Sequence, residues 1–302
     1  MRTEFGNVSV AANELTLPQT KKLVAAHVNS PRVSDNLLIG FDSRHLIFDN
    51  GRIFRMQTDV LAAFTPFDNF NYQIRFWEDG TTENFVLLYL DDEKYNLKAG
   101  RFYPAFGLRN ADHKAFARER TGHGSNVYLD GLSVGADFNG LNLVGETFNE
   151  QEQTILGGHA FYNVFLEPIS LLAGSSVRWS EKKEDEGGPS NRTFPHAKSL
   201  FGGINYDRFT LMGDLDLVGK SNDTLIFYSN FTTRLAYGLY LIGEYNFFDG
   251  DRSLKSGVDE FVRVSVELFP LPFVELRPSY TYYTRGALED QDDFFVQVHF
   301  GY

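Results

Sequence analysis

A cluster of basic side chains between Lys98 and Arg120 is the part of the sequence best suited to bind a charged ligand. This stretch holds six bases against two acids, whereas the whole chain of 302 residues has a formal net charge of -12. Arginine and lysine donate charge-assisted hydrogen bonds, so bases grouped in one segment favour anions. The six bases are Lys98, Arg101, Arg109, Lys114, Arg118 and Arg120.

The sequence gives little indication of thiol chemistry, metal binding or hydrolysis. The chain has no cysteine, which excludes disulfides, thiol catalysis, thiolate metal sites and covalent haem attachment. The histidines lack metal-ligand spacing, and the acids of 249–260 resemble a calcium loop in which Leu254 replaces the required glycine. No nucleophile-elbow motif is present. We therefore expect no enzyme, no metal and no cofactor, and the acidic balance argues against nucleic acid as a partner.

The chain around the basic cluster is a series of short runs in which apolar and polar residues alternate, a pattern typical of β-strands. In Phe70–Trp77, for example, Phe70 and Tyr72 alternate with Asn71 and Gln73. Residues 85–90 are instead apolar on both faces. The expected runs are 36–48, 52–65, 70–79, 84–92, 95–103, 126–138, 141–149, 154–165, 168–180, 196–206, 208–219, 223–234, 237–248, 259–269, 272–284 and 292–302.

These runs predict an all-β fold, a transmembrane antiparallel up-and-down β-barrel of about 16 strands. Charged residues at strand centres fit a barrel with a wet interior better than a soluble sandwich, whose apolar faces meet across one core. Alternate connections also differ in length, as expected for short periplasmic turns and longer extracellular loops. The tight connections are 66–69, 139–140, 167–168, 207, 236 and 270–272, and the long ones are 104–125, 181–195, 249–258 and 285–291.

The first 35 residues do not share the alternation. We expect residues 1–35 to form an N-terminal periplasmic or plug-like arm and residues 36–302 to form the barrel. No stretch approaches the roughly 20 consecutive apolar residues of a transmembrane helix. The N-terminus lacks the apolar centre of a signal peptide, so an exported protein of this sequence is expected to be a mature or trimmed form.

The run from Leu97 to Arg109 contains Gly100-Arg-Phe-Tyr-Pro-Ala-Phe-Gly107. It resembles the "GRF-x-P-x-FG" strand end of porin-like outer-membrane proteins, including phosphate-selective-type porins and porins paired with multihaem cytochromes. The resemblance covers about 25 residues, 97–120, and is only architectural elsewhere. It implies a transmembrane β-barrel with an aqueous path and does not identify the solute.

The loop that follows this strand is expected to fold back against the inner wall and narrow the lumen. Arg109, Lys114, Arg118 and Arg120 would then lie near the path, where rings of bases favour anions. Along the wall, Lys98, Arg101, Arg55, Arg75 and Arg277 are expected to extend this basic strip. The alternative is that the bases only pair with lumen carboxylates such as Asp59, Asp214, Asp216 and Glu275 and make the barrel rigid.

Three functions fit these expectations. The first is a porin of the bacterial outer membrane, an aqueous channel for small solutes with a general or mildly anion-selective character. The second is a barrel sleeve around a multihaem c-type cytochrome, forming an electron conduit. The third is a soluble all-β binding protein, suggested by the absence of a signal segment and by aromatic residues at 15% of the chain. The expected partners are outer-membrane lipid, a cytochrome for the second function, and further copies of the chain.

Overall fold

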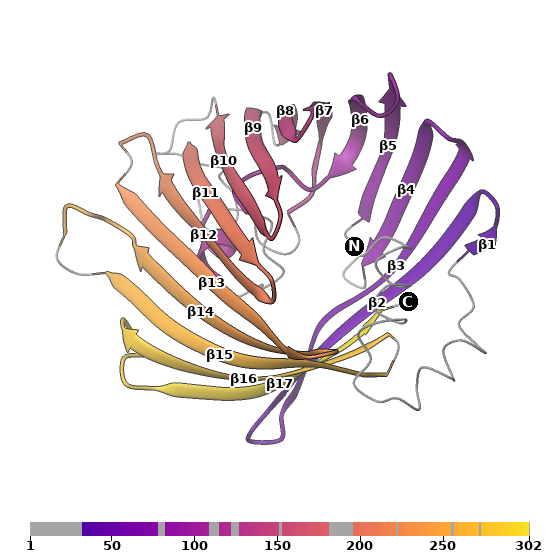
Figure 1. The fold of residues 1–302 in the computed structure, drawn as a ribbon. Helices are drawn as coiled ribbons and strands as arrows, with labels where there is room; N and C mark the ends of the chain where they lie inside the picture. Colours follow the sequence, from indigo (N-terminus) through magenta and orange to yellow (C-terminus); the bar gives the residue numbers. More distant parts are fainter. Residues whose placement is uncertain are drawn as a thin grey trace.

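Sixteen antiparallel strands, β2 to β17, form a closed barrel in the computed structural model (Figure 1). The structure describes residues 32–77, 82–108, 115–121, 127–150, 153–180, 196–221, 223–254, 257–271 and 273–301. The strands are β1 (Arg32–Ser34), β2 (Leu37–Phe48), β3 (Ile53–Phe67), β4 (Phe70–Trp77), β5 (Thr82–Leu90), β6 (Tyr95–Phe102), β7 (Leu129–Phe138), β8 (Leu141–Glu150), β9 (Gln153–Leu166), β10 (Ile169–Ser180), β11 (Ala197–Tyr206), β12 (Phe209–Val218), β13 (Thr224–Ala236), β14 (Leu239–Asp249), β15 (Val258–Leu271), β16 (Val274–Arg285) and β17 (Asp292–Gly301).

Each barrel strand pairs with its neighbours in sequence, and β17 pairs with β2 to close the ring. The start of β2 and the end of β17 therefore lie on the same side as the short turns, such as 139–140 and 207–208. The predicted barrel, its strand number and its two unequal sides are confirmed. Residues 1–31 lie outside the described part of the chain, and β1 pairs only with the first residues of β2.

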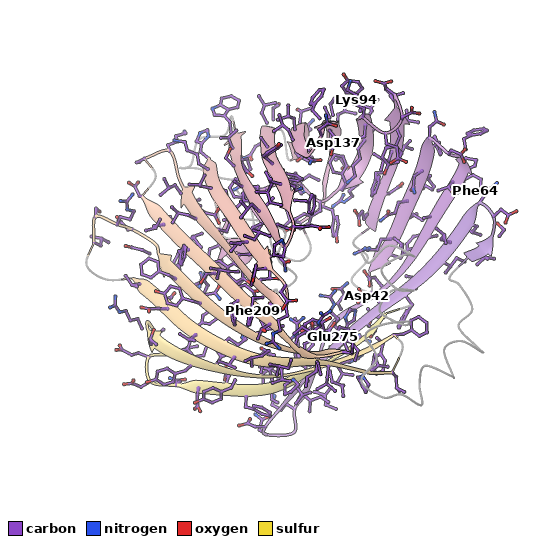
Figure 2. The ribbon with its side chains drawn as sticks, viewed as in Figure 1. Asp42, Phe64, Lys94, Asp137, Phe209 and Glu275 are labelled. Atoms are coloured by element: carbon purple, nitrogen blue, oxygen red, sulfur yellow. The ribbon has the colours of Figure 1, made fainter. Side chains whose placement is uncertain are left out.

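The alternation in sequence separates the two faces of the barrel wall (Figure 2). Side chains of the outer face are large, apolar and exposed, as lipid contact requires, and Phe64 in Figure 2 is one of them. The inner face carries charged side chains such as Asp42 and Glu275. No helix in the described residues is long and apolar enough to cross a membrane.

Exposed aromatic side chains follow the short-turn edge of the outer face. Tyr and Phe gather where a barrel passes from hydrocarbon to headgroups, because their rings tolerate both environments. Their positions mark the membrane boundary on this side. They are Phe67, Phe138, Tyr206, Phe209 and Tyr237.

Strand β5 explains the run that is apolar on both faces. Phe85, only 6% exposed, points inward and packs with Phe102, Phe148 and Ile155 in a buried cluster on the lumen side. Leu87 packs against the same cluster. The inner wall at β5 and β6 is thus partly apolar, because side chains there pack against one another instead of contacting water.

Gly100 allows β5 and β6 to approach closely at the strand end that carries the resemblance. Its φ is +128°, and an added Cβ would collide with the Asn84 carbonyl oxygen and lie 2.8 Å from the Phe85 Cα. We expect Gly100→Ala to destabilise the barrel by about 2 kcal/mol because backbone atoms cannot move aside. Heat-dependent mobility on detergent gels would measure this as a lower unfolding temperature. Gly145→Ala, where a Cβ meets nothing within 4 Å, is the control and should be close to neutral.

Candidate functional site: a loop fixed to a charged inner wall

The described residues of the loop between β6 and β7 lie inside the barrel, along its inner wall. Their backbone N–H groups donate hydrogen bonds to side chains on the inner wall, at strands far along the sequence. The anchors are Ala105 N to Glu146 Oε2 at 2.7 Å, Gly107 N to Ser176 Oγ at 2.9 Å, Leu108 N to Asp214 Oδ2 at 2.8 Å and Phe116 N to Asn246 Oδ1 at 3.1 Å. The acceptors stand on β8, β10, β12 and β14, so the described loop residues follow the wall across this half of the barrel.

Gly107 is the residue at which the loop meets the wall most closely. Its φ is +57°, a conformation that L side chains rarely adopt, and an added Cβ would lie 2.5 Å from Asp214 Oδ2. The Asp214 carboxylate also accepts a 2.5 Å hydrogen bond from Ser199 Oγ. The glycine in the porin-like motif is therefore required by this turn against β10 and β12.

A one-turn helix, α3 (Phe116–Glu119), packs the second described part of the loop, residues 115–121, against the wall. The Phe116 ring contacts the Phe261 ring edge-on, with centroids 5.1 Å apart, and also contacts Phe248 at 5.9 Å. Ala197, Val218 and Ile226 complete this buried cluster. The prediction that the loop folds back against the inner wall is confirmed for the described loop residues.

Arg178 of β10 is an anchor that the sequence analysis did not identify. Its side chain is 5% exposed, its Nη2 donates a 2.5 Å hydrogen bond to the Thr121 carbonyl oxygen, and its guanidinium lies 5.3 Å from the Phe106 ring centroid. It therefore contacts both the first and the last part of the loop. The available signal was its place between Ser176 and Ser180, on the inward-facing positions of an otherwise apolar run.

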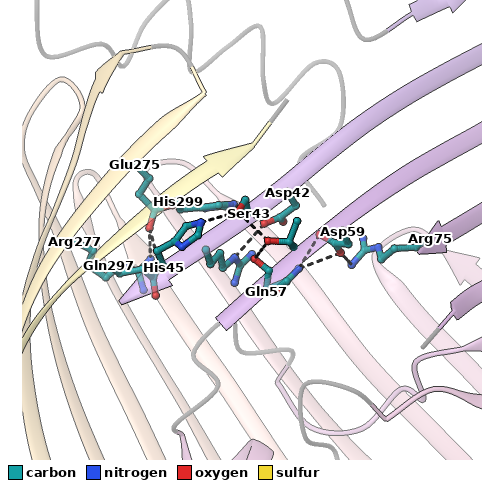
Figure 3. A network of polar contacts seen from close by, with 12 residues as sticks. Asp42, Ser43, His45, Gln57, Asp59, Arg75, Glu275, Arg277, Gln297 and His299 are labelled. Atoms are coloured by element: carbon teal, nitrogen blue, oxygen red, sulfur yellow. Dashed lines mark hydrogen bonds and ion pairs between the residues drawn. The ribbon is translucent and has the colours of Figure 1, made fainter. Parts of the chain in front are cut away.

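A second feature, which we call the charge ladder, lines the part of the wall around the seam where the barrel closes (Figure 3). At its centre, Arg277 of β16 forms ion pairs with Glu267 and, at 3.1 Å, with Glu275. His299 of β17 lies between two carboxylates, 3.1 Å from Glu275 and 3.0 Å from Asp42 of β2. These contacts connect four strands across the closing seam.

The charge ladder continues on both sides of the seam. Toward β5, Asp59 accepts from Gln57 Nε2 at 3.1 Å and pairs with Arg75 at 3.4 Å, and Arg75 pairs with Glu83 at 3.5 Å. Toward β13, Arg263 pairs with Glu244 at 3.4 Å, and Tyr228 donates to Glu244 at 3.0 Å. Its members are Asp42, Arg44, Gln57, Asp59, Arg75, Glu83, Tyr228, Glu244, Arg263, Glu267, Glu275, Arg277 and His299.

Four of the predicted pore bases lie on the inner face. Arg75 and Arg277 belong to the charge ladder. Lys98 places its Nζ 4.1 Å from the Phe85 ring centroid and 4.3 Å from that of Phe102. Arg120 lies 4.9 Å from the Phe248 ring and forms a 3.9 Å ion pair with Asp259.

Two predicted wall residues belong to the outer face. Arg101 is three positions after Lys98, so alternation turns it outward, where it pairs with exposed Asp130 at 3.7 Å. Arg55 is in register with His45, whose ring contacts the outer-face residue Phe300. The register of β2 and β3 shifts at this point, leaving one extra residue, Met56, in β3. This bulge reverses the face on which Arg55 lies.

The remaining predicted bases fall wholly or partly outside the described residues. Arg109 and Lys114 lie outside the described residues, and of Arg118 only the backbone is described, within α3. Among the described residues no group of three or more His, Asp or Glu side chains could hold a metal ion.

A closed antiparallel barrel that is apolar outside and charged inside, with residues of one loop packed on its inner wall, defines the class of outer-membrane β-barrels with porin-like architecture. No family model matches the sequence, and no curated protein matches it. Solved structures do match the fold.

Three solved structures illustrate this likeness. OprB of Pseudomonas putida, in its high-pH structure, has a TM-score of 0.66 at 8% identity, covering 88% of this chain and 94% of that chain. OmpT of Vibrio cholerae has a TM-score of 0.61 at 11% identity, covering 90% and 99%. An anion-selective porin from Comamonas acidovorans has a TM-score of 0.58 at 10% identity, covering 88% and 99%. At these identities the likeness is one of fold.

Proposed function

We propose that this chain is a diffusion channel for small solutes in the bacterial outer membrane. The observation that carries the proposal is the charged inner wall of a closed barrel. The charge ladder joins its side chains across strands β13 to β5, at the positions that face away from lipid. Ionised side chains on an inner wall need water or partners, because isolated charges in an apolar lumen cost several kcal/mol each. We place the water path between this ladder and the folded loop.

We further propose that selectivity is weak, with a mild preference for anions. Bases of the charge ladder have carboxylate partners, as Arg75 does with Asp59 and Glu83. Because the ladder holds six carboxylates and four arginines, it does not itself favour anions. The preference for anions would come from Lys98 and Arg120, together with Arg109, Lys114 and Arg118 of the same loop. A base that lies along the path attracts anions and repels cations.

The test is the reversal potential of the reconstituted protein across a salt gradient. The purified barrel is expected to conduct ohmically and to pass anions somewhat better than cations. The Arg109/Arg118/Arg120→Ala variant should shift the reversal potential toward cation selectivity. Its control is Arg55/Arg101/Arg285→Ala, which removes three positive charges away from the path and should leave the reversal potential unchanged. A barrel that inserts and does not conduct would contradict the proposal.

The two other functions suggested by the sequence fit these contacts less well. A sleeve for a multihaem cytochrome needs a lumen free to receive it, whereas part of this lumen holds the loop residues 103–108 and 115–121, which are fixed by their anchors and by the cluster around Phe116. A soluble binding protein would expose to water the band of large apolar side chains on the outer face, an area far larger than monomeric soluble proteins show.

A further inference from the structure

A groove lies on the outer face of the barrel, over strands β7 to β10. Its floor includes Gly145 and Gly158, which are directly opposed in the register of β8 and β9. Val134 and Val177 flank this glycine pair in the same row and are 58% and 56% exposed. The groove has a volume of about 630 Å³, within the range of roughly 300–1,000 Å³ that small-molecule sites occupy.

The alternation of the strands turns this groove toward lipid. Glu146 points inward, because its carboxylate accepts the Ala105 N–H of the loop on the inner wall. Its neighbour Gly145 therefore belongs to the outer face, together with Val134 and Gly158, with which it is in register. An added Cβ at Gly145 meets nothing within 4 Å, so the wall is lower here than at the valines on either side.

The groove reaches the short-turn edge of the barrel at Tyr95, which belongs to its lining. The Tyr95 ring contacts the ring of Phe138, at the membrane boundary, with centroids 6.0 Å apart. Val134 is four residues before Phe138 in β7, a distance of roughly 13 Å at about 3.3 Å per residue and close to half the thickness of a bilayer's hydrocarbon core. One acyl chain of the leaflet on this side can therefore lie along the groove.

Charged side chains of both signs surround the mouth of the groove. Lys94, in the turn between β5 and β6, lies at the edge of the barrel (Figure 2). Its Nζ is 5.3 Å from the Tyr95 ring centroid and 5.5 Å from that of Phe138. Lys94 also forms a 3.8 Å ion pair with Asp91, and both side chains remain well exposed. Three acids precede Lys94 in this exposed turn, namely Asp91, Asp92 and Glu93.

This charge pattern selects among headgroups. A phosphate can pair with Lys94, and a free ammonium on the same headgroup can pair with the acids of the turn. A headgroup with only a negative charge would meet the three acids without compensation. A quaternary ammonium has no N–H to donate to them.

We propose that the groove binds phosphatidylethanolamine from the membrane leaflet on the short-turn side. One acyl chain lies over Gly145 and Gly158, the phosphate pairs with Lys94, and the ammonium pairs with the acids of residues 91–93. This inference requires the barrel to sit in a membrane and is independent of whether the lumen conducts, so the two proposals can fail separately.

Native mass spectrometry of delipidated protein, titrated with one phospholipid at a time, tests the site. Wild type is expected to bind phosphatidylethanolamine about fivefold more tightly than phosphatidylcholine or phosphatidylglycerol, because only its headgroup pairs with charges of both signs. Asp91→Asn with Asp92→Asn should reverse the order of phosphatidylethanolamine and phosphatidylglycerol, since it removes partners of the ammonium and keeps Lys94.

Two single substitutions test the headgroup contact and the chain contact separately. Lys94→Gln should lower the affinity for phosphatidylethanolamine about fivefold, because a charged contact to phosphate is lost. Its control, Lys220→Gln on the long-loop side, should leave the affinity unchanged. Gly145→Leu fills the groove and should also lower the affinity about fivefold, because the chain loses packing contacts. Its control is Gly243→Leu on the outer face of β14, where an added Cβ again meets nothing within 4 Å.

Equal binding of the three phospholipids by wild type would overturn the proposal. Unchanged affinity in Lys94→Gln or in Gly145→Leu would do the same, as would an equal loss in either control. A wild-type mass of two or three chains that Gly145→Leu reduces to one would also overturn it, because a second copy of the chain would then occupy the groove. If Gly145→Leu does not fold, Gly145→Val takes its place with the same expected loss, and wild-type affinity would contradict the assignment.

Discussion

Replacing residues 105–121 by a short glycine–serine linker is expected to raise the single-channel conductance of the reconstituted barrel about two-fold or more, because pore width limits ion flow. The deleted segment carries the four wall anchors and the Phe116 ring, all of which lie inside the barrel. Strands β6 and β7 should remain paired, since Phe102 lies opposite Leu129 and their ends are adjacent. Planar-bilayer recording measures the change.

A smaller change isolates the anchors from the bulk of the loop. Asp214→Ala removes the acceptor of the Leu108 N–H and of the Ser199 hydroxyl and should give noisier current with brief openings of higher conductance. Thr147→Ala, a substitution on the outer face of β8, serves as the control and should behave as wild type. Equal conductance in wild type and in the loop-shortened barrel would show that the loop does not narrow the path.

Arg277→Met is expected to destabilise the folded barrel by about 3 kcal/mol, because removal of one partner leaves buried carboxylates uncompensated. Glu267 and Glu275 both pair with Arg277 and are 14% and 10% exposed at their side chains. The same variant should shift selectivity toward cations, since two negative charges are then exposed along the wall. Urea unfolding in lipid vesicles measures the stability, and the reversal potential measures the selectivity.

Arg101→Met provides a matched comparison on the outer face. Arg101 and Asp130 form an ion pair with side chains that are 43% and 67% exposed, and such exposed pairs contribute less than about 1 kcal/mol. The stability and the reversal potential should therefore stay close to those of wild type. Similar losses in both variants would mean that the ladder does not differ from surface ion pairs.

The architecture was predictable from the sequence because apolar and polar residues alternate within each strand and so identify its lipid-facing and lumen-facing sides. The alternation in Phe70–Trp77 and the contrast between the turn at 139–140 and the loop at 103–128 follow from local chemistry. The inward course of that loop was also predicted, from Pro104-Ala-Phe-Gly107 at the start of a long loop.

Which residues make up the site depends on strand neighbours and strand register, and neither can be read from the sequence. Arg178 and Asn246 lie far from the loop in sequence and reach it only because β10 and β14 form the part of the inner wall on which the described loop residues pack. His299 bridges Glu275 and Asp42 only because the last strand pairs with β2. The bulge at Met56 is a property of the register between two strands, and it alone decides the face of Arg55.

The central claim, that water passes along the charge ladder, is tested most directly by blocking the current from a single engineered thiol. The chain has no cysteine, so Gln297→Cys adds the only thiol, beside Arg277 and Glu275 on the inner face. A bulky charged thiol reagent should reduce its single-channel current in one step per barrel, and the same reagent should leave the outer-face neighbour Val296→Cys unchanged. Unaltered current in the Gln297→Cys barrel after complete labelling, or a block in Val296→Cys, would contradict the account.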